Sequence, residues 1–281
     1  MILLICLAGA WLITGAGWPD GCPDEPGRQK LTKFIYDNNR LPIGNEPEII
    51  LENYGFSYAL RPYLTAIIGA VFMKMISLFS TGDHAMLFAS RLCSVMSVTV
   101  CAFFCFKLGN RLFRKRGSAT LFGVLVCFIP QVMFLGMYQN NDSFSLMTIV
   151  IVLYFLVSGY QEHWRTKHCI GFSVGMVLGL LSYYSVYGWL LMSGIAFLFG
   201  LWRDTLSLRQ KVINFSLTVG IVLCLSGWFF IRNAILNHGD FFGMATEDIK
   251  TMMPIRIFRP IDREILFKAY LITNIRLPLI R

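Results

Sequence analysis

Residues 85–108 read AMLFASRLCSVMSVTVCAFFCFKL, an apolar run long enough to cross a lipid bilayer as a helix. The run carries one charge in its first half, Arg91, and one near its end, Lys107. Over the whole chain 56% of residues are hydrophobic and only 15% are charged, a balance unlike that of an average soluble domain. The sequence therefore predicts an all-α polytopic membrane protein with one helical membrane unit. Further apolar runs occupy residues 2–16, 59–80, 119–136, 144–158, 169–185, 186–202 and 212–231.

The formal net charge of +9 would suggest a nucleic-acid partner for a soluble protein. Here much of the positive charge falls in three short loops, at residues 107–116, 162–168 and 203–211. The positive-inside rule places such loops in the cytoplasm. Because the chain also lacks any zinc-finger, helix-turn-helix or RNA-binding motif, we predict no nucleic-acid partner.

The cytoplasmic loops fix the rest of the topology. They place residues 138–142 and the stretch after Ile231 outside, so the run 85–108 must begin outside. If the run 59–80 crossed the membrane, the run 85–108 would have to begin inside rather than outside. The run 59–80 also contains Arg61 and Lys74, which suit a helix at the membrane interface. We predict seven spans, with residues 18–84 forming a long external loop that contains interfacial helices.

The two ends and the cysteines leave some alternatives. Residues 2–17 lack the basic start of a signal peptide, which favours an uncleaved first helix. Residues 264–280 read either as an eighth, poor span or as a surface helix. The eight cysteines include no CxxC pair and no metal-ligand spacing, so we expect free, buried, small hydrophobic side chains.

Two acidic positions lie outside the membrane in this topology. Asp142 is the only acidic residue between His84 and Gln161, and a carboxylate at the edge of a bilayer is costly enough to suggest a function. Asp24 and Glu25 lie in the polar loop just beyond the first apolar run. Two acidic positions on one side of a membrane suggest chemistry on a polar substrate that a lipid carries at the membrane surface.

Five ordered segments resemble motifs of the GT-C superfamily of integral-membrane glycosyltransferases, in the branch of protein O-mannosyltransferases and aminoarabinose transferases. Tyr63 replaces a proline of the second motif, and family members are usually longer. A minimal enzyme, one half of a split protein and a remnant therefore all stay open. The segments are Pro23-Asp24-Glu25, Arg61-Pro62-Tyr63-Leu64, Ala89-Ser90-Arg91-Leu92, Asn140-Asn141-Asp142, and Trp228 with Arg232-Asn233 and His238-Gly239-Asp240.

The resemblance implies a GT-C-like core of about seven transmembrane helices over residues 1–243, followed by an external or interfacial tail at 244–281. It also implies transfer of a sugar from a polyprenyl-phosphate donor to an acceptor at the outer face of the membrane. Such a reaction needs a carboxylate base, cations for the lipid phosphate and an apolar groove for the prenyl chain. In this scheme Asp24 is the general base, and Glu25 orients a neighbour by hydrogen bonds.

Other candidate residues have a functional and a structural interpretation. Asp142 either lines the site or caps a helix that starts at Ser143. Arg61 and Arg232 either bind phosphate or extend to the lipid headgroups. Asn141 and His238 are the remaining candidates for substrate binding. For two further groups we favour the structural interpretation: Arg91 pairs with a loop acid or backbone carbonyls, and the aromatic residues Tyr183, Tyr184, Tyr187 and Trp189 belong to an interfacial belt.

We expect no essential cofactor or metal, although a divalent cation held by Asp24 and Asp142 stays open. The expected partners are the bilayer, a polyprenyl-phosphate-linked sugar and an acceptor that is a protein, a lipid or a cell-wall polymer; a partner subunit is a further option. We place the protein in the plasma membrane of the cell envelope, with its site on the extracytoplasmic face. Two alternatives remain: a lipid-linked-sugar transporter or flippase, and a non-catalytic subunit of a glycosylation complex.

Overall fold

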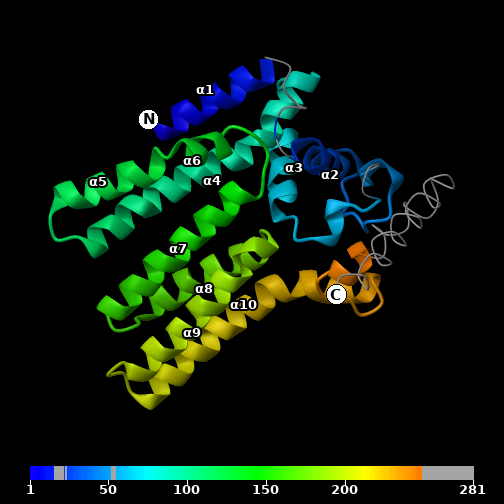
Figure 1. Cartoon of the computed structure of the whole chain (residues 1–281). Helices are drawn as coiled ribbons and strands as arrows, with labels where there is room; N and C mark the ends of the chain where they lie inside the picture. The colour runs from blue at the N-terminus through cyan, green and yellow to red at the C-terminus, as the bar shows by residue number, and fades with distance from the viewer. Residues whose placement is uncertain (16–21, 23, 52–54, 249–281) are drawn as a thin grey trace, which may run out of the picture.

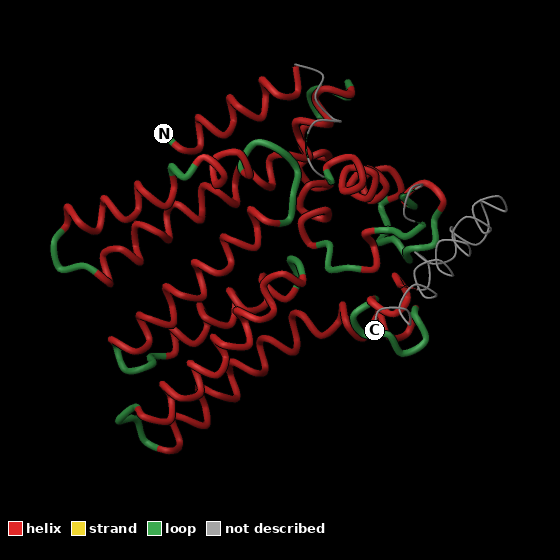
Figure 2. The backbone as a smooth tube through the Cα atoms, in the orientation of Figure 1, coloured by secondary structure: helices red, strands yellow, loops and turns green. Residues whose placement is uncertain are grey.

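The computed structural model describes residues 1–15, 22, 24–51 and 55–248, and all of the regular secondary structure in these residues is helical (Figure 2). The first half contains α1 (Ile2–Gly15), α2 (Glu25–Asn38), η1 (Pro47–Ile49), η2 (Tyr58–Leu60), α3 (Leu64–Ile76), α4 (Asp83–Leu112) and α5 (Arg116–Cys127). The second half contains α6 (Pro130–Leu135), α7 (Asp142–Gln161), α8 (Thr166–Leu180), η3 (Tyr184–Val186), α9 (Tyr187–Arg203) and α10 (Leu208–Leu236).

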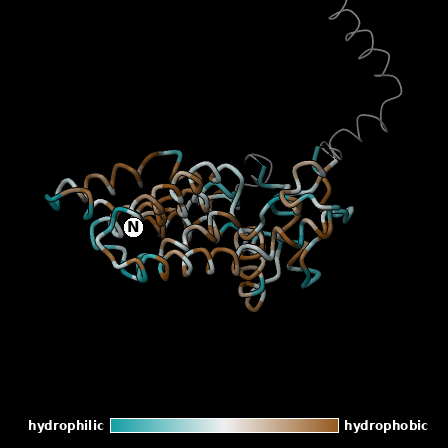
Figure 3. Tube along the Cα trace, turned by 90° about the horizontal axis from the view of Figure 1, so that it is seen from below, coloured by the Kyte–Doolittle hydropathy of each residue, from teal (hydrophilic) through white to brown (hydrophobic). Residues whose placement is uncertain are grey.

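The long helices form an antiparallel bundle with two different ends (Figure 1). The basic loops after α4, α7 and α9 lie together at one end, and α2, α3 and the end of α10 lie at the other. This arrangement agrees with the topology that the basic loops predict. Figure 3 shows apolar residues along the helices of the bundle. The chain is a multi-pass membrane protein.

The centre of the bundle is formed by α4 and α7, which pack against each other. Helices α1, α3 and α5 pack on α4, while α8 lies between α7 and α10. In the most apolar stretch of α4 56% of residues are buried, against 22% in α10, so α10 leaves more of its apolar residues at the surface than α4 does. In a membrane such a surface faces lipid.

Within the described residues, four helices are long and apolar enough to cross a membrane: α4, α7, the segment Tyr184–Arg203 and α10. Helix α1 is apolar but has 14 residues, so it rises about 21 Å, less than the hydrocarbon core of about 30 Å. Helices α5 and α8 are also short, with 12 and 15 residues. The seven-span arrangement therefore stays a prediction for these three short helices.

Prolines divide two segments that the sequence predicts to be continuous. The run 59–80 breaks at Pro62 into η2 and α3, and the run 119–136 breaks before Pro130, which opens α6. Proline favours both breaks because it lacks the amide hydrogen that an interior helical position requires. The expected alternatives for residues 264–280 lie outside the described residues.

Helix α1 is an integral part of the bundle. Its residues Cys6, Ala10 and Thr14 are buried, and the Ala10 carbonyl accepts a hydrogen bond from Arg91 of α4. Cleavage after this segment would remove these contacts, and the uncleaved first helix stays a prediction. All eight cysteines are free and all except Cys224 are buried, which confirms most of the expectation for them.

The close approach of α4 to α5 depends on a glycine. A Cβ atom on Gly109 would lie 2.7 Å from the Ala119 carbonyl oxygen, whereas one on Gly117 of the same hairpin would meet nothing within 4 Å. We expect Gly109→Ala to lower the free energy of unfolding by about 1–3 kcal/mol because the two helices must separate. Thermal unfolding in detergent measures the effect, with Gly117→Ala as the control. Equal stability of the two variants would contradict this account.

Candidate active site

A buried ion pair lies where α1, α2 and α4 meet. Arg91 donates from Nε to Glu25 Oε1 and from Nη2 to Glu25 Oε2, both at 2.8 Å, and both side chains have no exposed surface. Arg91 Nη1 also donates to Thr14 Oγ1 at 2.9 Å and to the Ala10 carbonyl at 3.2 Å. Arg91 therefore pairs with a loop acid and a backbone carbonyl, as the structural interpretation of the sequence expected.

Glu25 extends this network to the second acidic segment. Its Oε1 accepts a hydrogen bond from the Gln139 backbone amide at 2.8 Å, in the loop between α6 and α7. Burial and the Glu25 charge raise the pKa of the neighbouring Cys22 thiol to about 11, so the thiol stays protonated. Glu25 is enclosed and fully engaged, and these contacts suit a residue that orients its neighbours.

Asp24 contrasts with Glu25. It precedes α2 with a left-handed backbone (φ 58°), and 61% of its side chain is exposed. Its Oδ2 lies 3.8 Å from Nη2 of Arg28, one helical turn further along. Asp24 is thus an accessible carboxylate that stands beside a cation, with its backbone anchored through the buried Glu25.

Arg28 is a site residue that the sequence analysis missed. It is only 6% exposed, and its guanidinium carbon lies 5.2 Å from the ring centre of Tyr58 and 5.4 Å from that of Tyr183. Its Nε is buried and has no hydrogen-bond partner in the structure. The spacing of Asp24 and Arg28 by four residues, which places them on one face of a helix, is the sequence signal that could have identified it.

Arg61 faces the same two aromatic rings. Its guanidinium carbon lies 5.4 Å from the ring centre of Tyr58 and 5.6 Å from that of Tyr183. Its Nη1 donates to the Tyr183 hydroxyl, and its Nε and Nη2 bind the two carboxylate oxygens of Glu247. Both guanidinium groups lie over the rings of Tyr58 and Tyr183, and their positive charges repel each other. The space between them therefore favours an anion.

The aromatic residues predicted to form an interfacial belt separate into two groups. Tyr183 joins the arginine site, and Tyr184 packs on it with ring centres 6.2 Å apart. Trp189 is 54% exposed on α9, as an interfacial belt requires. Burial and the Asp24 charge raise the pKa of Tyr58 to about 12 despite both arginines, so its hydroxyl stays protonated.

A small cavity lies between the arginines and the 139–141 loop. Its volume of about 10 Å³ is room for roughly one water molecule. Arg28 Nε and Gln139 Oε1 are buried beside it without partners, a donor and an acceptor that one water could satisfy. Asn141, a predicted substrate-binding residue, also lines this cavity and accepts a hydrogen bond from Thr65 at 2.6 Å. The polar centre of the site is therefore narrow.

Asp142 does not cap α7, which corrects one interpretation of the sequence. The helix begins at Asp142 itself, and the Ser143 amide donates to Asn140 Oδ1 at 2.7 Å. The capping side chain is therefore that of Asn140, which is buried, whereas Asp142 is exposed. Burial, with the charge of Asp142, raises the pKa of Tyr138. An exposed Asp142 remains available to a substrate.

Arg232 has other partners than the paired arginines have. Arg232 donates to the Tyr63 hydroxyl at 3.1 Å and to the carbonyls of Leu41 and Pro42, so it holds the external loop against α10. His238 is exposed just beyond α10 and has a left-handed backbone. Phosphate binding by these two residues stays a prediction.

An apolar groove of about 510 Å³ runs along α8, α9 and α10. Tyr187 and Phe242 line it together with Leu190, Leu198 and Val222. Because Tyr187 packs against Tyr184, with ring centres 5.4 Å apart, this part of the groove lies close to the arginine site. The described residues contain no group of three His, Cys, Asp or Glu side chains suited to a metal ion.

Comparison with known proteins gives one match. The family model described as dolichyl-phosphate-mannose-protein mannosyltransferase matches residues 61–229, which is more than half of the chain. The chain therefore belongs to this family, in agreement with the GT-C resemblance, and the family indicates a membrane glycosyltransferase that uses lipid-linked sugars. No curated protein and no solved structure matches the chain.

Loss of the buried ion pair should destabilise the end of the bundle that lies opposite the basic loops. Arg91→Leu leaves the Glu25 carboxylate buried without its cation, and removing one partner of such a pair costs about 3–5 kcal/mol. We expect a correspondingly lower thermal midpoint in detergent. Arg165→Leu, at an exposed position in the loop before α8, is the control and should have little effect. If both variants unfold alike, the pair does not hold the site together.

Proposed function

We propose that this member of the dolichyl-phosphate-mannose-protein mannosyltransferase family moves a sugar from a polyprenyl-phosphate carrier to an acceptor hydroxyl, with Asp24 as the general base. The observation that carries the proposal is the exposed Asp24 carboxylate beside Arg28, which shares the rings of Tyr58 and Tyr183 with a second arginine, Arg61. The arrangement supplies a base and cations at the same end of the bundle.

Each group has a defined part in the transfer. The acceptor oxygen forms a bond to the anomeric carbon of the sugar and gives its proton to Asp24. The bond between the anomeric carbon and the phosphate oxygen breaks, and the polyprenyl phosphate leaves with the electron pair. Arg28 and Arg61 stabilise the charge that grows on this phosphate, because a guanidinium matches phosphate oxygens in geometry and charge.

The apolar groove suits the prenyl chain of the donor. It opens on the exposed faces of α9 and α10, which lipid would cover, and Tyr187 connects it to the arginine site. A donor could then keep its chain in the groove and its phosphate near Arg61. Burial of an apolar chain contributes about 25 cal/mol per Å², so the groove would supply affinity while the arginines set the position of the phosphate.

Asp24 and Arg28 lie at the start of α2, Arg61 follows η2, and Asp142 opens α7. Figure 1 shows α2 and the start of α7 away from the basic loops, which lie at the opposite end of the bundle. By the positive-inside rule we place the reaction on the extracytoplasmic face of the plasma membrane. Asp142 is exposed on that face and is a candidate to bind the acceptor. The proposal needs no metal ion.

Removal of the base should abolish transfer without abolishing donor binding. We expect Asp24→Asn to lose about 10²–10⁴-fold in turnover, the contribution of a positioned general base. The assay incubates the purified protein in lipid with a panel of labelled polyprenyl-phosphate sugars and measures release of the carrier phosphate. Asp37→Asn, an exposed acid on the same helix, is the matched control. An active Asp24→Asn variant would remove Asp24 from the mechanism.

Arg28 should act on the donor phosphate. Loss of a hydrogen bond to a charged group costs about 1.5–3 kcal/mol, so Arg28→Gln should weaken donor binding roughly 10–100-fold. Lys33→Gln removes an exposed positive charge from the same helix and serves as the control, because it changes net charge equally. Equal donor affinity in the two variants would exclude Arg28 from the phosphate site.

A further inference from the structure

The segment at residues 240–248, which we call the strap, folds back over the arginine site after α10. Asp240 stabilises its turn by accepting hydrogen bonds from the Gly243 and Thr246 amides, both at 2.8 Å, and from the Thr246 hydroxyl at 3.0 Å. Burial raises the pKa of Asp240, but these amide and hydroxyl donors lower it by more, so the carboxylate stays ionised. The strap is therefore a small folded unit.

Two contacts dock the strap on the protein. The Tyr184 hydroxyl donates to the Phe242 carbonyl, and Gly243 lies directly against the Leu60 carbonyl. A Cβ atom at Gly243 would lie 2.3 Å from the Leu60 oxygen, and the backbone there has φ +71°, so an alanine would not fit. The docked position depends on this glycine.

The docked strap brings Glu247 onto Arg61. Glu247 Oε2 accepts from Arg61 Nε at 2.8 Å, while Oε1 binds Nη2, and their side chains are 14% and 21% exposed. Two parallel hydrogen bonds from one guanidinium are the pattern that arginine makes with carboxylates and phosphates alike. The Glu247 carboxylate thus occupies the face of Arg61 that a phosphate would use.

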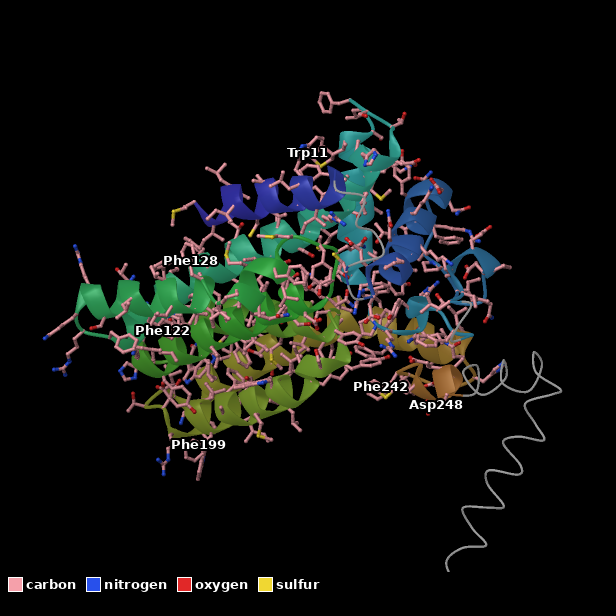
Figure 4. The ribbon with its side chains drawn as sticks, turned by 45° about the horizontal axis from the view of Figure 1, so that its top comes forward. Trp11, Phe122, Phe128, Phe199, Phe242 and Asp248 are labelled. Atoms are coloured by element: carbon pink, nitrogen blue, oxygen red, sulfur yellow. The ribbon has the colours of Figure 1, made fainter. Side chains whose placement is uncertain are left out.

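The strap also reaches the groove. Phe242 lines it together with Tyr187, and the two rings lie 6.4 Å apart. Figure 4 shows Phe242 at the edge of the bundle and Asp248 farther along the same segment. Since Phe242 touches the groove and Glu247 touches Arg61, the strap covers the path between them.

We infer that the strap is a gate on the donor site, latched by Glu247 on Arg61, and that the phosphate of a prenyl-phosphate ligand opens it by displacing the Glu247 carboxylate. The inference rests on the proposed function, because it takes Arg61 as a phosphate ligand. One guanidinium face cannot hold both anions, so binding of the ligand and closure of the strap exclude each other. The gate keeps Arg61 paired when no donor is bound.

Binding of farnesyl phosphate to the full chain in nanodiscs tests the gate, with farnesol as the probe that lacks the phosphate. We expect Glu247→Gln to bind farnesyl phosphate about tenfold more tightly than the native protein, because a charged competitor is lost. Affinity for farnesol should not change. Asp248→Asn removes the same charge from the exposed neighbouring residue and should leave both affinities unchanged.

Hydrogen exchange of the strap amides gives a readout that does not depend on activity. The amides of residues 243–247 should exchange faster in Glu247→Gln, and faster in the native protein when farnesyl phosphate is added. Gly243→Ala should release the strap without changing charge and should tighten farnesyl phosphate binding in the same way. Gly227→Ala, where an added Cβ meets nothing within 4 Å, is its control.

The outcomes separate the two proposals. If farnesyl phosphate binds but Glu247→Gln binds it equally or more weakly, Glu247 positions Arg61 and the gate is wrong, while the donor site stands. If the native protein binds farnesyl phosphate but the strap amides do not exchange hydrogen faster, the gate proposal is equally wrong. If neither the native protein nor either strap variant binds farnesyl phosphate, the donor site itself fails, and the gate fails with it.

Discussion

The ion pair of Glu25 and Arg91 is the interaction on which the end of the bundle opposite the basic loops depends. Both side chains are enclosed, so each charge is stabilised only by the other and by nearby dipoles. Through Ala10, Thr14 and the Gln139 amide the pair joins α1, the start of α2, α4 and the loop before α7. These four segments carry or position Asp24, Arg28 and Asp142.

The pair also explains why two adjacent acids differ. Glu25 lies inside with three hydrogen bonds to its carboxylate from Arg91 and Gln139, and Asp24 is turned outward by a left-handed backbone. The enclosed Glu25 carboxylate cannot reach a substrate, whereas the exposed Asp24 carboxylate is free to meet one. The division of roles thus follows from burial, which adjacent positions in a sequence do not reveal.

The arginine site follows a second constraint, the need to neutralise clustered positive charge. Arg28 and Arg61 stand over the same tyrosine rings, and the anions beside them are Asp24 and Glu247. One of these anions is local in sequence, and the other comes from beyond α10. A phosphate would offer these arginines the same pairing that the carboxylates provide.

The sequence by itself determined the helical membrane class and the family. It also indicated that the basic loops lie at one end of the bundle and that Arg91 needs a partner. Hydropathy, loop charge and the cost of a buried charge act locally, so the sequence shows them. It also pointed to Asp24 and Arg61. Only the tertiary structure decided the rest: Asn140 rather than Asp142 caps α7, Arg232 holds a loop, and Arg28 and Glu247 join the site. The physical reason is that a side chain's role depends on which distant segments enclose it, and Glu247 meets Arg61 across 186 positions of sequence.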